Sequence, residues 1–395
     1  MEELAQHWSL DQDVVFLNHG SFGACPVAVQ QHQQQLRQRL ERQPVEFYLR
    51  DLEPMLDDAR ARLAAFLNCN SNDLAWLPNI TTGINSVMRS LKFSPGDELL
   101  LTNHEYNACR NVIDHVALRD DARVVVVDLP FPISGFDEAH EIIMAGVTDR
   151  TRLALLDHVT SQTGLVMPLE TLIPALRERG VQTLIDGAHA PGMIDVDIEA
   201  LGADYYSANC HKWICAPKGA AFLHVRPEHQ EKIRPAVISH GANSTRTDRS
   251  RFLVEFDWPG TWDPTAVLCV PFALECLSSM LPGGWDEVRS RNREMVIAGR
   301  ELLCAALGID APCPEAMLGS LASLPLPDSP DPASGSALYG DPLQDKLLQR
   351  WGIEVPLIPW PAHPQRLIRI SAQLYNPLSH YELLANALRE LFTAT

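Results

Sequence analysis

The chain has 395 residues, of which 46% are hydrophobic and 21% charged, so a soluble globular protein of about two or three domains is expected. Its 32 basic and 50 acidic residues give a net charge of −18, which argues against nucleic acid or an anionic membrane as the main partner. The nine cysteines lack metal or disulfide spacing and no apolar signal segment opens the chain, so we expect a cytoplasmic protein without a metal site.

The first two thirds of the chain alternate helical patterns with short apolar runs. Helices are expected over 30–40 and 51–67. Beyond them, strands are expected at 98–102, 123–127, 152–157, 182–186, 205–209 and 220–225, with helices at 107–118, 136–143 and 169–179. Continuous apolar strands between helices predict an α/β fold with a mostly parallel sheet covered on both faces.

After residue 264 the pattern changes to long helices, expected over 265–281 and 285–307. A loop at 325–336, a helix at 342–351, strands at 353–358 and 367–371, and a helix at 379–392 follow. We therefore expect a large domain over 26–264 and a smaller α+β domain over 265–395. Residues 1–25 are expected to pack near the active site and the smaller domain.

Three polar motifs follow apolar runs of the expected sheet. Thr81, Thr82 and Gly83 begin a helix, where free N–H groups favour an anion, although a simple helix cap has the same pattern. The Asp-Gly-Ala-His motif at 186–189 follows one strand, and the Asn-Cys-His-Lys-Trp motif at 209–213 follows the next. Asp186 and Lys212 are therefore expected at the same sheet edge, where α/β sheets bind ligands.

A fourth feature is Arg369, which lies within an apolar strand of the smaller domain. A buried arginine needs a carboxylate or phosphate partner, supplied by either a ligand or an internal salt bridge.

Together and in this order, the motifs resemble the class V aminotransferase family of fold-type I pyridoxal 5′-phosphate enzymes, over nearly the whole chain. The resemblance implies that Lys212 holds the cofactor as a Schiff base and moves the Cα proton, and that Asp186 pairs with the pyridine nitrogen. It further implies cofactor contacts from a set of residues spread over the large domain: Thr81, Thr82, Gly83, Tyr106, Ser161, Gln162, His189, Asn209, His211, Gly260 and Thr261. Gly260 and Thr261 are expected to reach the neighbouring subunit of a homodimer with shared active sites.

The segment Asn18-His19-Gly20-Ser21 and the sequence after Arg369 are most similar to the isopenicillin N epimerase-like subgroup. The resemblance places Arg369 on the carboxylate of an amino-acid substrate. The N-terminal segment either lies near that substrate or only packs on the smaller domain.

The common chemistry implied is removal of a Cα proton to a carbanion, after which epimerisation, transamination or β-elimination remain open. Our leading expectation is an epimerase-like enzyme, and the main alternative is a C–S lyase acting on a cysteine conjugate. No cysteine lies between residues 353 and 369, which argues against a desulfurase that forms a persulfide on the protein. A protein of this fold reduced to a binding or regulatory role is the non-enzymatic alternative.

Overall fold

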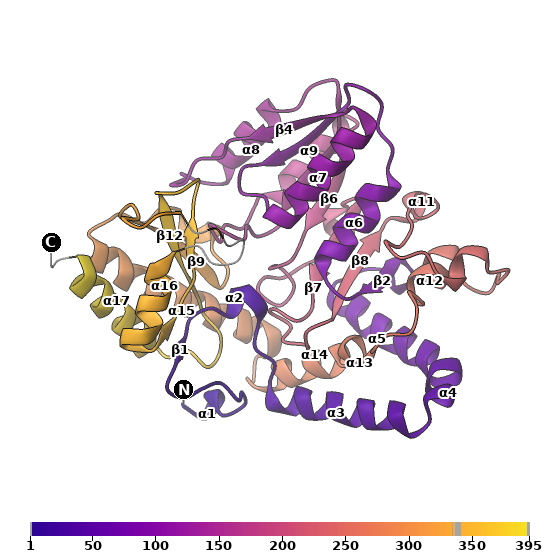
Figure 1. Ribbon diagram of the computed structural model, residues 1–395, viewed down its shortest axis with the longest axis horizontal. Coiled ribbons are helices and arrows are strands. Elements are labelled where there is room, and N and C mark those ends of the chain that lie inside the picture. Colours follow the sequence, from indigo (N-terminus) through magenta and orange to yellow (C-terminus); the bar gives the residue numbers. More distant parts are fainter. Residues whose placement is uncertain (1, 334, 336–340, 393–395) are drawn as a thin grey trace.

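The computed structural model describes residues 2–333, 335 and 341–392. Its main element is a seven-stranded sheet with the order β2-β8-β7-β6-β5-β3-β4 (Figure 1). The strands are β2 (Leu74–Leu77), β3 (Glu98–Thr102), β4 (Arg123–Val127), β5 (Thr151–Asp157), β6 (Gln182–Asp186), β7 (Tyr205–Asn209) and β8 (Ala221–Val225). β4, β3, β5, β6 and β7 run parallel, and β8 is antiparallel to both of its neighbours. The α/β prediction is confirmed.

Both faces of this sheet are buried, because successive strand residues enter two different hydrophobic clusters. On β5, Leu153 and Leu155 face one cluster, while Ala154 and Leu156 face the other. The first cluster is closed by α6 (Ile80–Ser90), α7 (Asn107–Asp120) and α12 (Arg251–Phe256), and the second by α5 (Leu52–Phe66), α8 (Phe136–Ala145) and α9 (Leu169–Glu178). The carboxyl ends of the parallel strands are thereby left as the open edge.

The C-terminal part contains a three-stranded antiparallel sheet with the order β11-β12-β9. Its strands are β9 (Leu321–Leu326), β11 (Leu357–Pro359) and β12 (Arg366–Ser371), and they lie beside α15 (Gly284–Leu307), α16 (Pro342–Trp351) and α17 (Leu378–Phe392). β9 was missed, because its last two residues were placed in a loop expected over 325–336. Of that loop, residues 334 and 336 lie outside the described residues.

The helix expected over 265–281 is broken into α13 (Thr265–Leu268) and α14 (Val270–Ser279). Pro271 lies in the first turn of α14, where its missing N–H and its ring prevent the preceding helix from continuing. No single helix within the described ranges is long and apolar enough to cross a membrane, although Thr265–Ser279 and Gly284–Leu307, bent by 71°, would qualify as a pair by length and composition.

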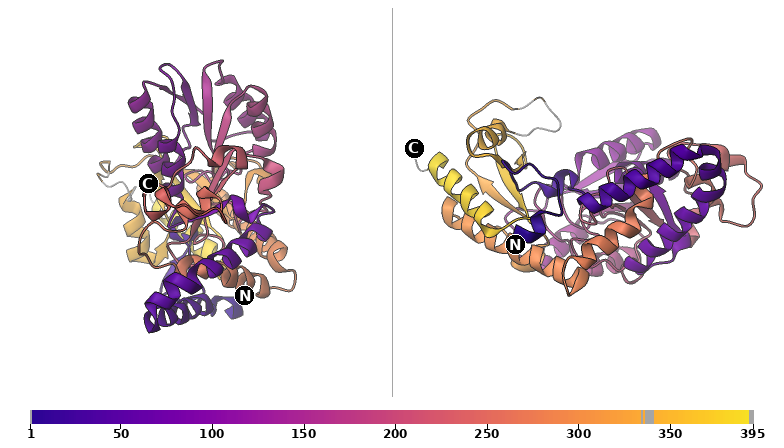
Figure 2. Two further views of the ribbon diagram at one scale, coloured as in Figure 1. Left: turned by 90° about the vertical axis from the view of Figure 1, so that its right-hand side faces the viewer. Right: turned by 90° about the horizontal axis from the view of Figure 1, so that it is seen from below.

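The N-terminal segment bridges the two parts of the chain. β1 (Val15–Phe16) pairs in parallel with β10 (Ile353–Glu354), and the Leu17 carbonyl accepts a hydrogen bond from Ser371 N–H. The short helix α2 (His19–Phe22) follows, between the large sheet and the C-terminal strands (Figures 1 and 2). One hydrophobic cluster runs through both parts, so the division at residue 264 stays a prediction.

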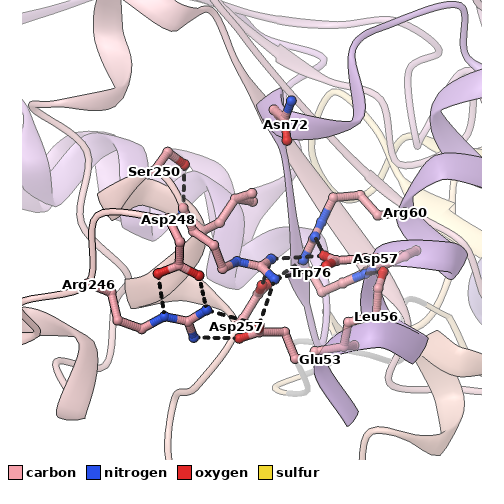
Figure 3. Close-up of polar contacts among 12 residues, drawn as sticks. Glu53, Leu56, Asp57, Arg60, Asn72, Trp76, Arg246, Asp248, Ser250 and Asp257 are labelled. Atoms are coloured by element: carbon pink, nitrogen blue, oxygen red, sulfur yellow. Dashed lines mark hydrogen bonds and ion pairs between the residues drawn. The ribbon is translucent and has the colours of Figure 1, made fainter. Parts of the chain in front are cut away.

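A network of ion pairs fastens α12 and the loop before it to α5 (Figure 3). Arg60, whose side chain is 3% exposed, bonds to Asp57 and Asp257, and Arg249 reaches the same two carboxylates. Arg246 bonds to Glu53 on α5. Because Asp257 is shared by two arginines, this network fixes the start of the loop that carries Gly260 and Thr261.

Candidate active site

A cavity of about 170 Å³ lies at the carboxyl ends of β5, β6 and β7, beneath α2 and the start of α6. It collects side chains from segments far apart in the sequence. The lining residues are Ser21, Phe22, Asn79, Ile80, Thr81, Tyr106, Asp157, Ser161, Asp186, Ala188, His189, Asn209, His211 and Lys212.

Lys212 follows the end of β7 and its amine lies inside this cavity. Burial, and secondarily the charge of Arg369, lower the pKa of Lys212 to about 7. Its Nζ lies 2.9 Å from His189 Nε2. A large part of the lysine population is therefore uncharged near neutral pH, the form in which an amine attacks a carbonyl carbon.

Asp186 is the last residue of β6, and its carboxyl group is buried beside Lys212. Its Oδ1 accepts a hydrogen bond from Ala188 N–H at 2.9 Å, and its Oδ2 accepts one from the Cys109 thiol at 3.2 Å. Burial raises the pKa of Asp186. A cationic N–H partner in the cavity would therefore stabilise the carboxylate considerably.

Two further buried carboxyl groups, which were not predicted from the sequence, lie beside Asp186. Asp157 ends β5 and lines the cavity, while Glu105 follows β3. Burial, and then the neighbouring carboxylates, raise the pKa of Glu105 and of Asp157 well above their usual values. Asp157 could have been found by the reasoning that selected Asp186, because it too ends an apolar parallel strand.

The first turn of α6 is capped by side chains of the protein. The Asn79 side chain caps the helix by accepting from Thr82 N–H at 2.9 Å, and Ile80 N–H donates to Asn209 Oδ1 at 3.0 Å. Thr81 lines the cavity, whereas Thr82 does not. A Cβ on Gly83 would lie 2.3 Å from Ser207 Oγ, so this glycine permits close packing of α6 on β7 rather than an approach to a ligand. Asn79 was missed as a member of the site.

His211 completes this end of the cavity. Its Nδ1 lies 3.3 Å from the Ala220 carbonyl oxygen, which only a protonated Nδ1 can bond. Burial, and then Lys212, lower the pKa of His211 to about 4, so the ring is neutral at pH 7.

Arg369 lies on β12, is 4% exposed, and is not itself among the residues that line the cavity. Its guanidinium bonds to the carbonyl oxygen and Oγ of Ser161 and, at 3.1 Å, to Ser21 Oγ. No carboxylate of the described residues pairs with it, and burial lowers its pKa to about 10. A buried cation with only neutral partners is suited to bind an anionic group of a ligand.

The four residues expected from the N-terminal segment have different surroundings. Ser21 lines the cavity, and a Cβ on Gly20 would lie 3.6 Å from both Arg369 and His189. Asn18 does not line the cavity and instead accepts a 2.5 Å hydrogen bond from Ser21 Oγ.

His19 also lies outside the cavity lining. Its ring nitrogens lie 2.8 Å from Tyr375 Oη and 3.0 Å from the Lys212 carbonyl oxygen, so both are occupied within the protein. The geometry therefore favours a role in holding the backbone of Lys212 over the expected substrate contact.

Tyr106 and Gln162 flank the cavity on the side of β3 and β5. Tyr106 precedes α7 and is 41% exposed, so its ring is free to cover a planar ligand. Gln162 donates to the Glu105 carbonyl oxygen at 3.4 Å, and its buried Oε1 has no partner among the described residues. Gly260 and Thr261 do not line this cavity, and their assignment to a neighbouring subunit's site stays a prediction.

The fold and this cavity define a class of protein, an enzyme that holds its cofactor at the carboxyl edge of an α/β sheet. The sequence profile "Aminotransferase class-V" matches residues 25–259, and the chain belongs to this family of pyridoxal phosphate enzymes.

Two curated relatives match almost the whole chain. Isopenicillin N epimerase of Amycolatopsis lactamdurans is 35% identical, and the match covers 97% of this chain and 96% of the epimerase. The probable L-cysteine desulfhydrase, chloroplastic, of Arabidopsis thaliana is 32% identical, and the match covers 96% of this chain and 83% of the desulfhydrase. The epimerase-like subgroup is thereby confirmed.

Solved structures show the same fold. The cystine C-S lyase C-DES superposes with a TM-score of 0.80 at 22% identity, covering 96% of this chain and 98% of its own. The cysteine desulfurase CsdA of Escherichia coli superposes with a TM-score of 0.79 at 20% identity. The match covers 99% of this chain and 98% of CsdA.

The residues present fit pyridoxal phosphate. Lys212 supplies an uncharged amine for its aldehyde, Asp186 a buried acceptor for its ring nitrogen, and Tyr106 a ring face. Thr81, Asn79 and His211 lie together at the positive end of the α6 dipole, which suits a phosphate.

Proposed function

We propose that the chain removes the Cα proton of an amino acid, as an epimerase-like enzyme, and that Lys212 is the base. The observation that carries this proposal is the position of the Lys212 amine, which lies in one cavity with Asp186 and 2.9 Å from His189 Nε2. Burial lowers the pKa of this amine to about 7, and Arg369, a second buried cation, has no carboxylate partner among the described residues. Bound pyridoxal phosphate supplies an electron sink that makes the Cα proton acidic.

Residues in and beside the cavity bind the substrate, transfer the proton and hold the cofactor. Arg369 and Ser21 bind the α-carboxylate of the substrate, which fixes Cα relative to the Lys212 amine. Lys212 Nζ takes the proton from Cα, and Asp186 holds the ring nitrogen protonated through its buried carboxylate. His211 and the first turn of α6 hold the phosphate, and Tyr106 covers the ring and excludes water from one side.

Epimerisation requires a proton donor on the face of Cα opposite Lys212. Four hydroxyl-bearing side chains line the cavity, Ser21, Thr81, Tyr106 and Ser161, and we assign this role to Tyr106. β-Elimination of a thiol is the second candidate. It needs only the Lys212 amine, and relatives named L-cysteine desulfhydrase align with almost the whole chain. No cysteine lies between β10 and Arg369, so we assign no protein persulfide to either outcome.

The test is to incubate the holoenzyme in deuterium oxide with L-amino acids, including cysteine, cystine and penicillins that carry an L-aminoadipyl side chain. Deuterium at Cα with inverted configuration supports the epimerase, and pyruvate with released sulfide or thiol supports the lyase. If no tested amino acid gains Cα deuterium or loses its side chain, while the cofactor stays attached to Lys212, the proposal of Cα chemistry fails.

We also propose a homodimer in which Gly260 and Thr261 reach the phosphate bound by the partner subunit. The ion-pair network that holds Asp257 supports this proposal, because it fixes the base of their loop. Mixing inactive Lys212→Ala and Thr261→Trp chains tests it, because a heterodimer with shared sites regains one intact site. Activity that does not recover, in a mixture shown to exchange subunits, contradicts it.

A further inference from the structure

Trp213 directly follows the proposed base and is 1% exposed. Its indole Nε1–H donates a 3.3 Å hydrogen bond to Nδ1 of His189. An indole nitrogen can only donate, so Nδ1 of His189 must be the acceptor and carry no proton. Burial, and then the charges of Lys212 and Arg369, lower the pKa of His189 well below its usual value, so the ring is neutral. The single ring proton of His189 is therefore on Nε2.

This placement determines the direction of the next hydrogen bond. His189 Nε2 lies 2.9 Å from Lys212 Nζ, and with its proton there it is the donor. The lysine amine accepts this bond only through a free lone pair, which an ammonium group lacks. A charged Lys212 would force the proton of His189 onto Nδ1, against the N–H of Trp213.

We propose that Trp213 is a positioning residue which, through the tautomer of His189, holds the Lys212 amine uncharged and ready to bond the cofactor. The inference rests on the proposed function in one respect, that Lys212 is the lysine that takes the cofactor. After that bond forms, the same Nε2–H remains aimed at the centre of the cavity, where it can donate to an oxygen of the bound ring.

The other charged and titratable groups around Lys212 do not depend on the indole N–H of Trp213, so replacing Trp213 leaves them in place. Arg369 lowers the pKa of Lys212, whereas Asp186, Cys109 and Asp157 raise it, and His211 and His19 lie next to the His189 ring. None of these groups bonds to Trp213 Nε1. A Trp213→Phe variant keeps an aromatic ring near His19, whose ring centroid lies 4.8 Å from that of Trp213, and removes the donor together with part of the indole volume.

The experiment uses the full-length apoenzyme, prepared by removing the cofactor with hydroxylamine. The rate at which it captures pyridoxal phosphate covalently is followed by absorbance from pH 6 to pH 9. In Trp213→Phe we expect the pH of half-maximal rate to rise by about one unit, so that capture at pH 7 slows about fivefold. Trp76→Phe is the matched control, because Trp76 is also buried and its Nε1 donates to the Leu56 carbonyl oxygen, away from the cavity.

A double-mutant cycle separates this mechanism from simple repacking. In a His189→Phe background, Trp213→Phe should cause no further shift, because the relay is already broken. An unchanged midpoint in Trp213→Phe, an equal shift in Trp76→Phe, or a full further shift in the His189→Phe background would overturn the proposal.

A second measurement needs no Trp213 variant and therefore does not depend on its folding. Nitrogen-15 NMR of the histidine-labelled apoenzyme reports the ring tautomer, with the His189 signals assigned by their loss in His189→Phe. Protonated Nε2 is expected, and protonated Nδ1 overturns the proposal. Failure of the proposed function would instead appear as covalent capture at a lysine other than Lys212.

Discussion

Asp157 and Asp186 are register partners on the neighbouring parallel strands β5 and β6, and each ends its strand with a buried carboxyl group. Oδ2 of Asp157 has no hydrogen-bond partner among the described residues. Side chains of register partners point to the same face, so both carboxyl groups are crowded into one low-dielectric region with Lys212 as the nearby amine.

The contribution of Asp157 to the stability of the apoenzyme should therefore fall as the pH rises. The folded-state pKa of Asp157 lies well above 3.8, so its stabilising contribution is fully present below pH 3.8 and is lost as the pH passes the raised value. Asp157→Asn stays uncharged, and we expect it to be more stable than wild type at pH 8 by about 1–3 kcal/mol. Thermal unfolding at pH 5 and pH 8 measures this, with the exposed Asp328→Asn as control. A variant that loses stability more steeply than wild type toward pH 8 contradicts the account.

Arg369 and Arg366 lie on the same strand and allow a matched comparison. Arg369→Gln should raise KM for amino acids by about 30-fold or more, because a charge-assisted contact worth about 2 kcal/mol or more is lost. Its stability should not fall, because the arginine it removes has no carboxylate partner.

Arg366→Gln should instead lower stability by about 3–5 kcal/mol, because it leaves the buried Asp341, now bonded at 2.7 Å, without its partner. Steady-state kinetics and thermal unfolding of both variants separate the two roles. Equal loss of stability in the two variants would argue against a substrate-binding role for Arg369.

Gly83→Ala should destabilise the protein by about 1–3 kcal/mol through overpacking, because its Cβ would lie 2.3 Å from Ser207 Oγ and 2.9 Å from Leu77. The shift of α6 should also weaken cofactor binding. Gly135→Ala is the control, since nothing lies within 4 Å of its Cβ position. Chemical denaturation gives the stabilities and absorbance titration the affinities. A Gly83→Ala protein as stable as Gly135→Ala would show that α6 does not depend on this close contact.

Asp257→Ala should lower stability by about 3–5 kcal/mol, because Arg60 is buried and loses one of its two carboxylates (Figure 3). Asp248→Ala, which removes an exposed partner of Arg246, should have little effect. Thermal unfolding compares the two. Similar unfolding temperatures of Asp257→Ala and Asp248→Ala would mean that the ion-pair network does not hold α12 on α5.

Several strands could be located from the sequence because they are continuous apolar runs. β3, β4, β6 and β7 have the expected bounds, whereas β9 was missed because Pro325 indicated a loop. Its ladder with β12 stabilises β9, and pairing between distant segments is invisible in a local pattern.

The candidate site shows the same limit. Asp186 and Lys212 follow strands, so their shared edge was predictable from the order of the elements. The contact of His19 with the Lys212 carbonyl oxygen and the bond from Trp213 to His189 depend on side-chain directions that only the folded chain defines.

The central claim is that Lys212 holds the cofactor. The most direct test is to reduce the holoenzyme with borohydride, digest it and locate the phosphopyridoxyl group by mass spectrometry. The account predicts a single labelled peptide carrying the group on Lys212, and no label at the nearby Lys218, whose amine bonds to the Gly23 carbonyl oxygen at 3.0 Å. A label on any other lysine, or none in a protein with cofactor absorbance, would contradict it.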